Sequence, residues 1–231
     1  GRCGFFEKRI VIELFARSPL MREAVSLAER VSVTDANVLI TGESGAGKDL
    51  LATFIHSKSK RAAQPFVKID CATLPGELLE AELFGYERGA FTGAVEARAG
   101  RFEAAQHGTI VLDEIAHLST DAQAKLLRVI ERREFERLGG RRTIKLDARL
   151  LALTNVDLDS AVKAGRFRED LFYRLNVIHI RVPPLRERKQ DMAALIQYFI
   201  KQYAAKHARK VDRVSRPVLA LLKSYEYPGN A

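Results

Sequence analysis

Two features that mark secreted and membrane proteins are scarce in this sequence: cysteines and long runs of apolar side chains. Among 231 residues only Cys3 and Cys71 are cysteines, which excludes a disulfide framework and a thiolate-rich zinc site. No apolar run approaches the roughly 20 residues that span a bilayer. The first residues lack both a secretory-signal layout and an initiator methionine, so we expect a cytoplasmic protein of which this chain is a fragment.

Other absences narrow the chemistry further. The sequence contains no G-x-S-x-G elbow, no internal repeat and no low-complexity stretch, and its five histidines show no metal-ligand spacing. The net charge of +9 could indicate a nucleic-acid partner. The basic residues are spread along the chain, however, which favours a solvated surface with a few cations facing phosphate over a dedicated DNA groove.

Short apolar runs alternate with helical patterns through the first 180 residues. Runs that are apolar throughout suit strands covered on both faces, and helices between them imply a parallel sheet. In such sheets the chemistry gathers at the carboxyl edge of the strands. The runs are residues 38–40 before Gly42, 66–69 before Asp70, 110–112 before Asp113, 150–153 before Thr154 and Asn155, and 177–180. The sequence therefore predicts an α/β core.

A boundary follows at Pro183-Pro184. Beyond it, apolar residues at helical spacing predict two helices, the second starting near Ser215. We interpret residues 1–13 as a linker or cloning remnant, 14–183 as the α/β core, and 184–231 as the start of a truncated helical lid.

Residues 42–48 match the phosphate-binding pattern G-x-x-x-x-G-K between a predicted strand and a predicted helix. The glycines let backbone N–H groups converge on phosphate oxygens, the helix N-terminus adds its positive dipole end, and Lys48 supplies a charge for the outer phosphates. The expected nucleotide-binding residues are Gly42, Glu43, Ser44, Gly45, Ala46, Gly47, Lys48 and Asp49. Asp49 stands where most such loops carry a Ser or Thr magnesium ligand, so it either reaches the ion through water or faces elsewhere.

A second apolar strand ends in two carboxylates, Asp113 and Glu114. Asp113 is placed to orient a magnesium ion, directly or through water, and Glu114 to polarise an attacking water. The pair lies near the phosphate loop if the two strands are neighbours. For this motif alone, a solvated acidic turn is the alternative.

Between these motifs lies a more specific string. Residues 89–94 read Gly-Ala-Phe-Thr-Gly-Ala, identical to the GAFTGA signature of sigma-54-dependent transcription activators, and residues 82–88 also resemble that family. The resemblance continues through further segments and covers residues 18–230. Those segments are residues 123–130, 135–140, 167–176 and 183–188. The chain thus resembles the central AAA+ ATPase domain of these activators.

The resemblance implies a P-loop NTPase that uses ATP and Mg²⁺ and forms a ring, usually a hexamer, with ATP between subunits. The loop Gly89, Ala90, Phe91, Thr92, Gly93 and Ala94 would contact sigma-54 bound to RNA polymerase and remodel the closed complex. Small residues flanking a Phe suit a mobile loop with an apolar tip; the alternative is that Phe91 plugs into the core. DNA recognition in this family belongs to a C-terminal helix-turn-helix domain absent from this chain.

Other residues take roles from the same resemblance. Asn155 resembles the first sensor of the γ-phosphate, whose amide holds water or a phosphate oxygen. Arg168 and Arg174 match the arginines presented to the neighbouring subunit's nucleotide, where a permanent charge suits the transferring phosphoryl group. A turn residue and ordinary surface ion pairs are the alternatives. Residues 131–142 resemble a second mobile loop that works with the first.

Two departures from the family pattern stand out. Asp70 replaces the usual Asn that restrains the catalytic Glu114, and a carboxylate donates no amide hydrogen bond. We expect altered coupling between target binding and hydrolysis. The family's second-sensor arginine falls beyond the end of the chain.

Three rival interpretations remain. Another AAA+ remodeller explains the ATP motifs but leaves the GAFTGA string unexplained. A nucleotide-gated scaffold that barely hydrolyses ATP gains support from Asp49 and Asp70. Direct DNA binding by this chain depends on net charge alone.

Overall fold

The computed structural model describes residues 15–208, 211 and 214–230, so the predicted segment 1–13 lies wholly outside the described residues, as does the first residue of the predicted core. Its centre is a five-stranded sheet in the order β2-β5-β8-β1-β9, and every pairing in this sheet is parallel. All five predicted strands are confirmed. They are β1 (Val38–Thr41), β2 (Phe66–Asp70), β5 (Thr109–Asp113), β8 (Arg149–Thr154) and β9 (Ile178–Arg181).

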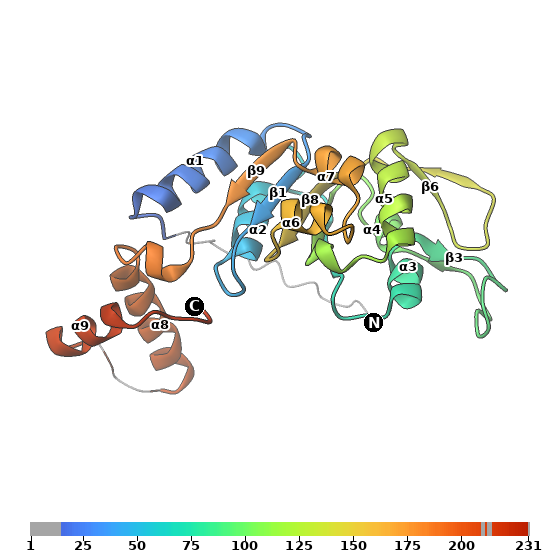
Figure 1. The fold of residues 1–231 in the computed structure, drawn as a ribbon. Helices are drawn as coiled ribbons and strands as arrows, with labels where there is room; N and C mark the ends of the chain where they lie inside the picture. Colours follow the sequence, from blue (N-terminus) through green and yellow to red (C-terminus); the bar gives the residue numbers. More distant parts are fainter. Residues whose placement is uncertain (1–14, 209–210, 212–213, 231) are drawn as a thin grey trace.

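Helices cover both faces of this sheet, as the doubly apolar strands require (Figure 1). On one face lie α1 (Pro19–Ser32) and α2 (Lys48–Ser57). The other face carries α3 (Gly76–Phe84), α4 (Arg101–Ala104), α5 (Thr120–Arg132), α6 (Leu158–Lys163) and α7 (Glu169–Leu175). Alternate residues of each strand feed the two cores, so that Ile110 and Leu112 pack on the second face and Val111 on the first.

Local sequence signals set the first helix. The Ser18 hydroxyl accepts the Met21 N–H at 3.3 Å, and Pro19 fills the first helical turn, where its missing donor costs nothing. At the other end, the fully buried Arg149 donates to the carbonyls of Val31 and Ser32 at 2.9 and 3.0 Å. The guanidinium thus binds two carbonyls of the last turn of α1 from the middle strand of the sheet.

Two small hairpins extend from the end of the core beyond α3 and α5 (Figure 1). The first pairs β3 (Gly85–Tyr86) with β4 (Arg98–Ala99) and carries residues 89–94 at its tip; the second pairs β6 (Glu134–Glu136) with β7 (Thr143–Lys145). Short 3₁₀ turns at Ile115–His117 and Leu185–Glu187 complete the core and lead into the lid.

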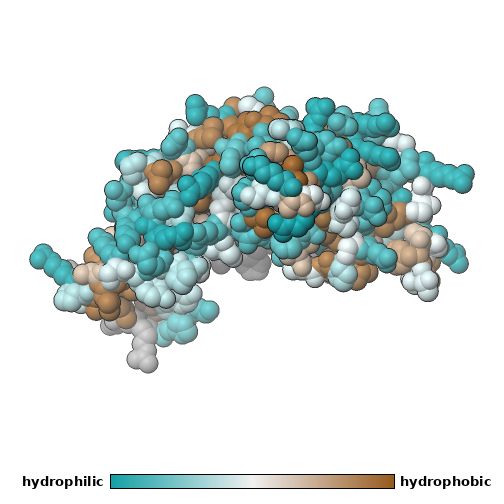
Figure 2. Space-filling model, viewed as in Figure 1, coloured by the Kyte–Doolittle hydropathy of each residue, from teal (hydrophilic) through white to brown (hydrophobic). Residues whose placement is uncertain are grey.

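The predicted helical lid is present at the opposite end of the molecule. It contains α8 (Met192–Lys206) and α9 (Arg216–Ser224). Hydrophobic residues gather at the surface of the lid (Figure 2). Leu221 in α9 and Tyr225 just after it are both exposed. Among the described residues, none of the helices is long and apolar enough to cross a membrane.

Candidate functional site

The phosphate loop joins the end of β1 to the start of α2. Gly45 and Gly47 have φ values of 73° and 102°, in the left-handed region that side chains with a Cβ rarely adopt. Gly47 stands at the N-cap position of α2, so the free N–H groups of the first helical turn face the loop. The loop thus presents donors and a helix N-terminus to an anion, as the sequence predicted.

Lys48 points back into this loop. Its side chain is buried, and the ammonium donates to the carbonyls of Gly42 and Glu43 at 2.9 and 3.3 Å. The same nitrogen lies 3.5 Å from Glu114 Oε1. The structure therefore brings the loop lysine and the second acidic motif together.

The strands that carry these two motifs are not neighbours, because β8 lies between β1 and β5. The motifs meet because Lys48 and Glu114 reach across the end of β8. Glu114 has a φ of 50°, and its Oε2 accepts the Asn155 N–H at 3.2 Å. Asn155 thus touches the predicted water-polarising glutamate through its backbone. Next to it, a cavity of about 270 Å³ opens at the carboxyl edge of the sheet.

Asp113 is held by two donors. Its Oδ1 accepts the Glu114 N–H at 3.0 Å, and its Oδ2 pairs with the Lys68 ammonium at 2.7 Å. Lys68 also pairs with Asp49 at 2.6 Å. Burial opposes the charge on Lys68, but hydrogen bonds to Asp113 and Asp49 outweigh it and raise the pKa of the ammonium.

Lys68 was not predicted from the sequence, although the alternation of side chains along the strand could have indicated it. Side chains alternate along a strand, so Lys68 shares a face of β2 with Asp70. In the parallel register Asp70 is opposite Asp113, which places all three residues on the α2 side of the sheet. Asp70 itself accepts the Ala72 N–H at 2.9 Å, while Glu114 is engaged by Lys48 and Asn155.

The lid also contacts the phosphate loop, through hydrogen bonds from two of its residues. Arg186 donates to both carboxylate oxygens of Glu43, one of them at 2.8 Å. The Asn230 amide donates to the Ser44 carbonyl at 2.9 Å and to Glu43 at 3.2 Å. Hydrogen bonds from Arg186 and then Asn230 lower the pKa of Glu43 to about 2.

Two buried charged residues at the start of the lid extend this contact. Arg188 donates to the Ala46 carbonyl at 2.6 Å. Asp191 is fully buried and accepts the N–H and hydroxyl of Ser18 at 2.8 and 2.9 Å and the N–H of Arg17 at 2.5 Å. The lid is therefore tied to both the phosphate loop and the N-terminus of α1.

The two predicted trans-acting arginines lie at the two ends of α7, at the protein surface. Arg168 precedes the helix and pairs with Asp170 at 2.8 Å. Arg174, in the last turn, lies 3.3 Å from Glu131 and its side chain is 61% exposed. Within one chain, both arginines contact surface carboxylates, and their accessibility is what a role toward a neighbouring copy requires.

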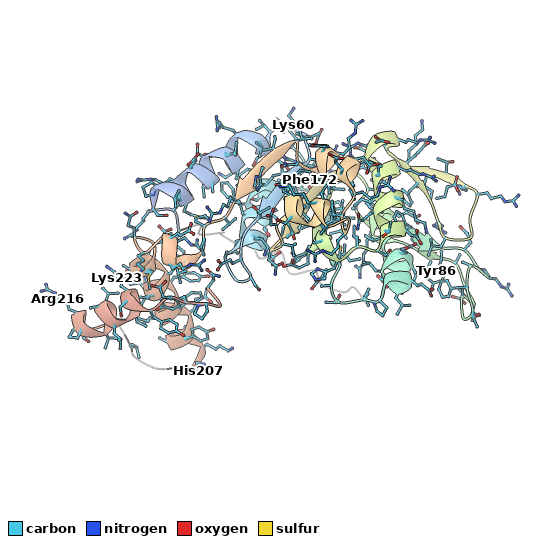
Figure 3. All side chains as sticks on the ribbon, viewed as in Figure 1. Lys60, Tyr86, Phe172, His207, Arg216 and Lys223 are labelled. Carbon is cyan, nitrogen blue, oxygen red and sulfur yellow. The ribbon has the colours of Figure 1, made fainter. Side chains whose placement is uncertain are left out.

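The loop of residues 89–94 is a tight turn with an accessible tip. Gly89 N–H donates to the Ala94 carbonyl at 2.9 Å and Ala94 N–H to that of Phe91 at 3.0 Å. Phe91 is 42% exposed, and its ring lies edge-on to Tyr86 with centroids 5.0 Å apart. Phe91 therefore does not plug into the core. Tyr86 lies at the end of the molecule remote from the lid (Figure 3).

The second hairpin packs directly against the first. Leu138 exchanges backbone hydrogen bonds with Glu87 and Gly85, at 3.0 and 2.9 Å. Gly139 has a φ of 69°, and a Cβ there would lie 2.9 Å from that of Ala90. A side chain at position 139 would thus collide with the loop as well as strain the backbone.

One arginine joins these hairpins to the core. Arg137 donates to Glu103 at 2.7 and 2.8 Å and to Glu87 at 3.2 Å. The hydrogen bond from Arg137 lowers the pKa of Glu103. The two predicted loops are in contact, through backbone pairing and this arginine.

Comparisons with known proteins agree with this geometry. Residues 14–181 match the Sigma-54 interaction domain family, and residues 186–231 match the AAA+ ATPase lid domain. The regulatory protein AtoC of Escherichia coli is 48% identical over 217 residues, covering 94% of this chain and 47% of AtoC. The transcriptional regulatory protein FlbD of Caulobacter vibrioides is 47% identical over 224 residues, covering 97% of this chain and 48% of FlbD.

Comparison with solved structures gives the same fold. NtrX of Brucella abortus in complex with ADP has a TM-score of 0.87 at 39% identity, covering 95% of this chain and 48% of NtrX. The chain thus spans about half the length of the relatives it matches. The fold is that of an AAA+ P-loop NTPase with its lid, and the chain belongs to the Sigma-54 interaction domain family.

Proposed function

We propose that this chain is the ATP-hydrolysing domain of a sigma-54-dependent activator, which remodels the sigma-54 RNA polymerase closed complex in the cytoplasm. The observation that carries the proposal is the meeting of Lys48 and Glu114 at 3.5 Å, which combines a phosphate-binding cation with a water-polarising base. A projecting turn with a half-exposed Phe91 supplies a surface on which mechanical work is delivered.

Each part of the proposed ATP hydrolysis is assigned to particular residues. The loop N–H groups and Lys48 bind the β- and γ-phosphates, since backbone donors and an ammonium both favour charged oxygens. Glu114 accepts a hydrogen bond from the attacking water and aligns it with the γ-phosphorus. Asn155 holds the backbone of this edge against Glu114, so the base keeps its orientation.

The donor set fits a magnesium ion shared with the nucleotide. Among the described residues no group of three or more His, Cys, Asp or Glu forms a metal cage. Mg²⁺ in NTPases needs only one or two carboxylates besides phosphates and water, and Asp113 supplies such a ligand, directly or through water. When bound, the ion would supply positive charge that offsets the charge developing on the phosphate oxygens.

The proposal requires a homo-oligomeric ring, a hexamer by family pattern. Arg168 and Arg174 would then leave their surface carboxylates for the nucleotide of the adjacent copy. The hairpin tip, Gly89 to Ala94, would contact sigma-54. DNA contacts would belong to a helix-turn-helix domain outside this chain, and Asp70 would alter how target binding is relayed to Glu114.

A native-gel assay with purified sigma-54 and ADP plus aluminium fluoride tests this function. We expect a stable complex that needs the transition-state mimic and is lost in Thr92→Ala but retained in Thr120→Ala, an exposed threonine on α5. ATP hydrolysis without any complex would favour a different AAA+ remodeller. Nucleotide binding with neither hydrolysis nor complex would favour a nucleotide-gated scaffold.

A further inference from the structure

Lys68 lies between two carboxylates, one of which, Asp113, is the proposed magnesium ligand. Its ammonium is 2.6 Å from Asp49 Oδ1 and 2.7 Å from Asp113 Oδ2. Asp49 lies in the first turn of α2, and Asp113, the proposed metal ligand, is the last residue of β5. One amine therefore joins α2 to the end of β5.

Both oxygens of Asp113 already have donors. Oδ1 accepts the N–H of Glu114, a backbone group fixed by the turn after β5. Oδ2 accepts Lys68, whose four-carbon side chain is 37% exposed and free to swing. Of the two partners, only Lys68 is able to leave without refolding the strand end. A cation that coordinates Asp113 through Oδ2 must therefore compete with Lys68.

Asp49 explains why an amine is needed here. A Ser or Thr at this position is neutral, whereas Asp49 adds a negative charge beside the phosphate site. An unpaired carboxylate there would repel the phosphates, and the helix N-terminus offsets only part of that repulsion. Lys68 neutralises it and still reaches Asp113.

We propose that Lys68 is a positioning residue for the metal: it holds Asp113 before the metal arrives, yields Oδ2 to Mg²⁺, and remains paired with Asp49. This inference rests on the proposed nucleotide site. Lys68 thereby weakens divalent-cation binding, and it permits an acidic residue at the start of α2. It makes no contact with the reacting phosphorus.

Electron paramagnetic resonance of Mn²⁺ tests this with the ADP-bound chain, so no turnover is involved. We expect Lys68→Met to lower the dissociation constant of Mn²⁺ roughly 5- to 20-fold, because a competing unit charge a few ångströms away is removed. Lys68→Arg keeps the charge and should stay near the wild-type value. Lys60→Met is the matched control, since Lys60 follows the far end of α2 and lies away from the phosphate loop (Figure 3).

A second readout is ADP binding in EDTA. Lys68→Met should weaken metal-free ADP binding, because Asp49 and Asp113 are then unpaired beside the phosphates. Unchanged or weaker Mn²⁺ binding in Lys68→Met would overturn the inference, as would an equal change in Lys60→Met. If the wild-type chain fails to bind ADP at all, the proposed function itself is wrong, so the two failures are distinguishable.

Discussion

The two ends of the core are held in different ways. At the nucleotide end, charged side chains join segments that are remote in sequence: Asn230 binds Glu43 across 187 positions, and Asp191 binds Ser18 across 173. At the projecting end, neighbouring hairpins rely on backbone pairs, one aromatic contact and Arg137. The first arrangement anchors the phosphate loop and α1 to the lid, whereas the second is confined to the two hairpins and their link to α4.

Glu114→Gln gives the largest expected effect and confines it to the nucleotide end. The amide is a poor base, so ATP hydrolysis should fall about 10²- to 10⁴-fold. ADP affinity should change little because the loop and Lys48 are intact. Phosphate release and ADP titration measure the two quantities, and a parallel loss of both would mean that Glu114 has a structural role.

Phe91→Ala should have the opposite profile. We expect loss of the sigma-54 complex in the native gel with ATP hydrolysis within about 2-fold of wild type, because Phe91 is half-exposed and remote from Glu114. A large loss of hydrolysis would show that the two ends are more tightly coupled than their contacts suggest.

Arg137→Ala tests the link between the projecting end and the core. Leaving the partly buried Glu103 without its charged partner should cost about 1–3 kcal/mol of unfolding free energy. Amide exchange should accelerate over residues 85–99 and stay unchanged in α1. Arg141→Ala, at an exposed position of the second hairpin, is the control, and equal exchange in both variants would contradict the prediction.

The smallest effect should come from pH. The folded pKa of Glu43, about 2, lies below its ordinary value of 4.5, so its pairing with Arg186 stabilises the fold above pH 4.5. That contribution is lost as pH falls from 4.5 toward 2. Thermal unfolding of Glu43→Gln should therefore show a shallower pH dependence in this window than wild type. Glu23→Gln, on the exposed side of α1, should keep the wild-type slope.

Local patterns predicted most of the fold, and they singled out Lys48, Glu114 and Asn155, which the structure brings together. Apolar runs revealed all five strands, because the three inner strands are buried on both faces and the two edge strands bury at least one side chain. The Ser18-Pro19 pair located α1. The phosphate loop was readable because its glycines are needed for the backbone itself. What these signals share is that their physical cause lies within a few residues.

Contacts between segments that are remote in sequence could not be predicted from the sequence. No residue near Glu43 in the sequence indicates that Arg186 and Asn230 bind it. Likewise, no residue near Asp113 indicates that Lys68 pairs with it. Strand order was equally hidden, since β8 enters between β1 and β5 only after both have been made. Such pairings depend on topology, which one sequence leaves open among several parallel arrangements.

The grip of Asn230 on the phosphate loop also has a consequence for how the chain is made. A ribosome that has just added Ser44 must add 186 further residues before the amide that binds its carbonyl exists. At about 5–20 residues per second, that interval is roughly 10 to 40 seconds. Throughout it the loop lacks the Asn230 contact, so the phosphate loop should reach its final, lid-bound form only late in synthesis.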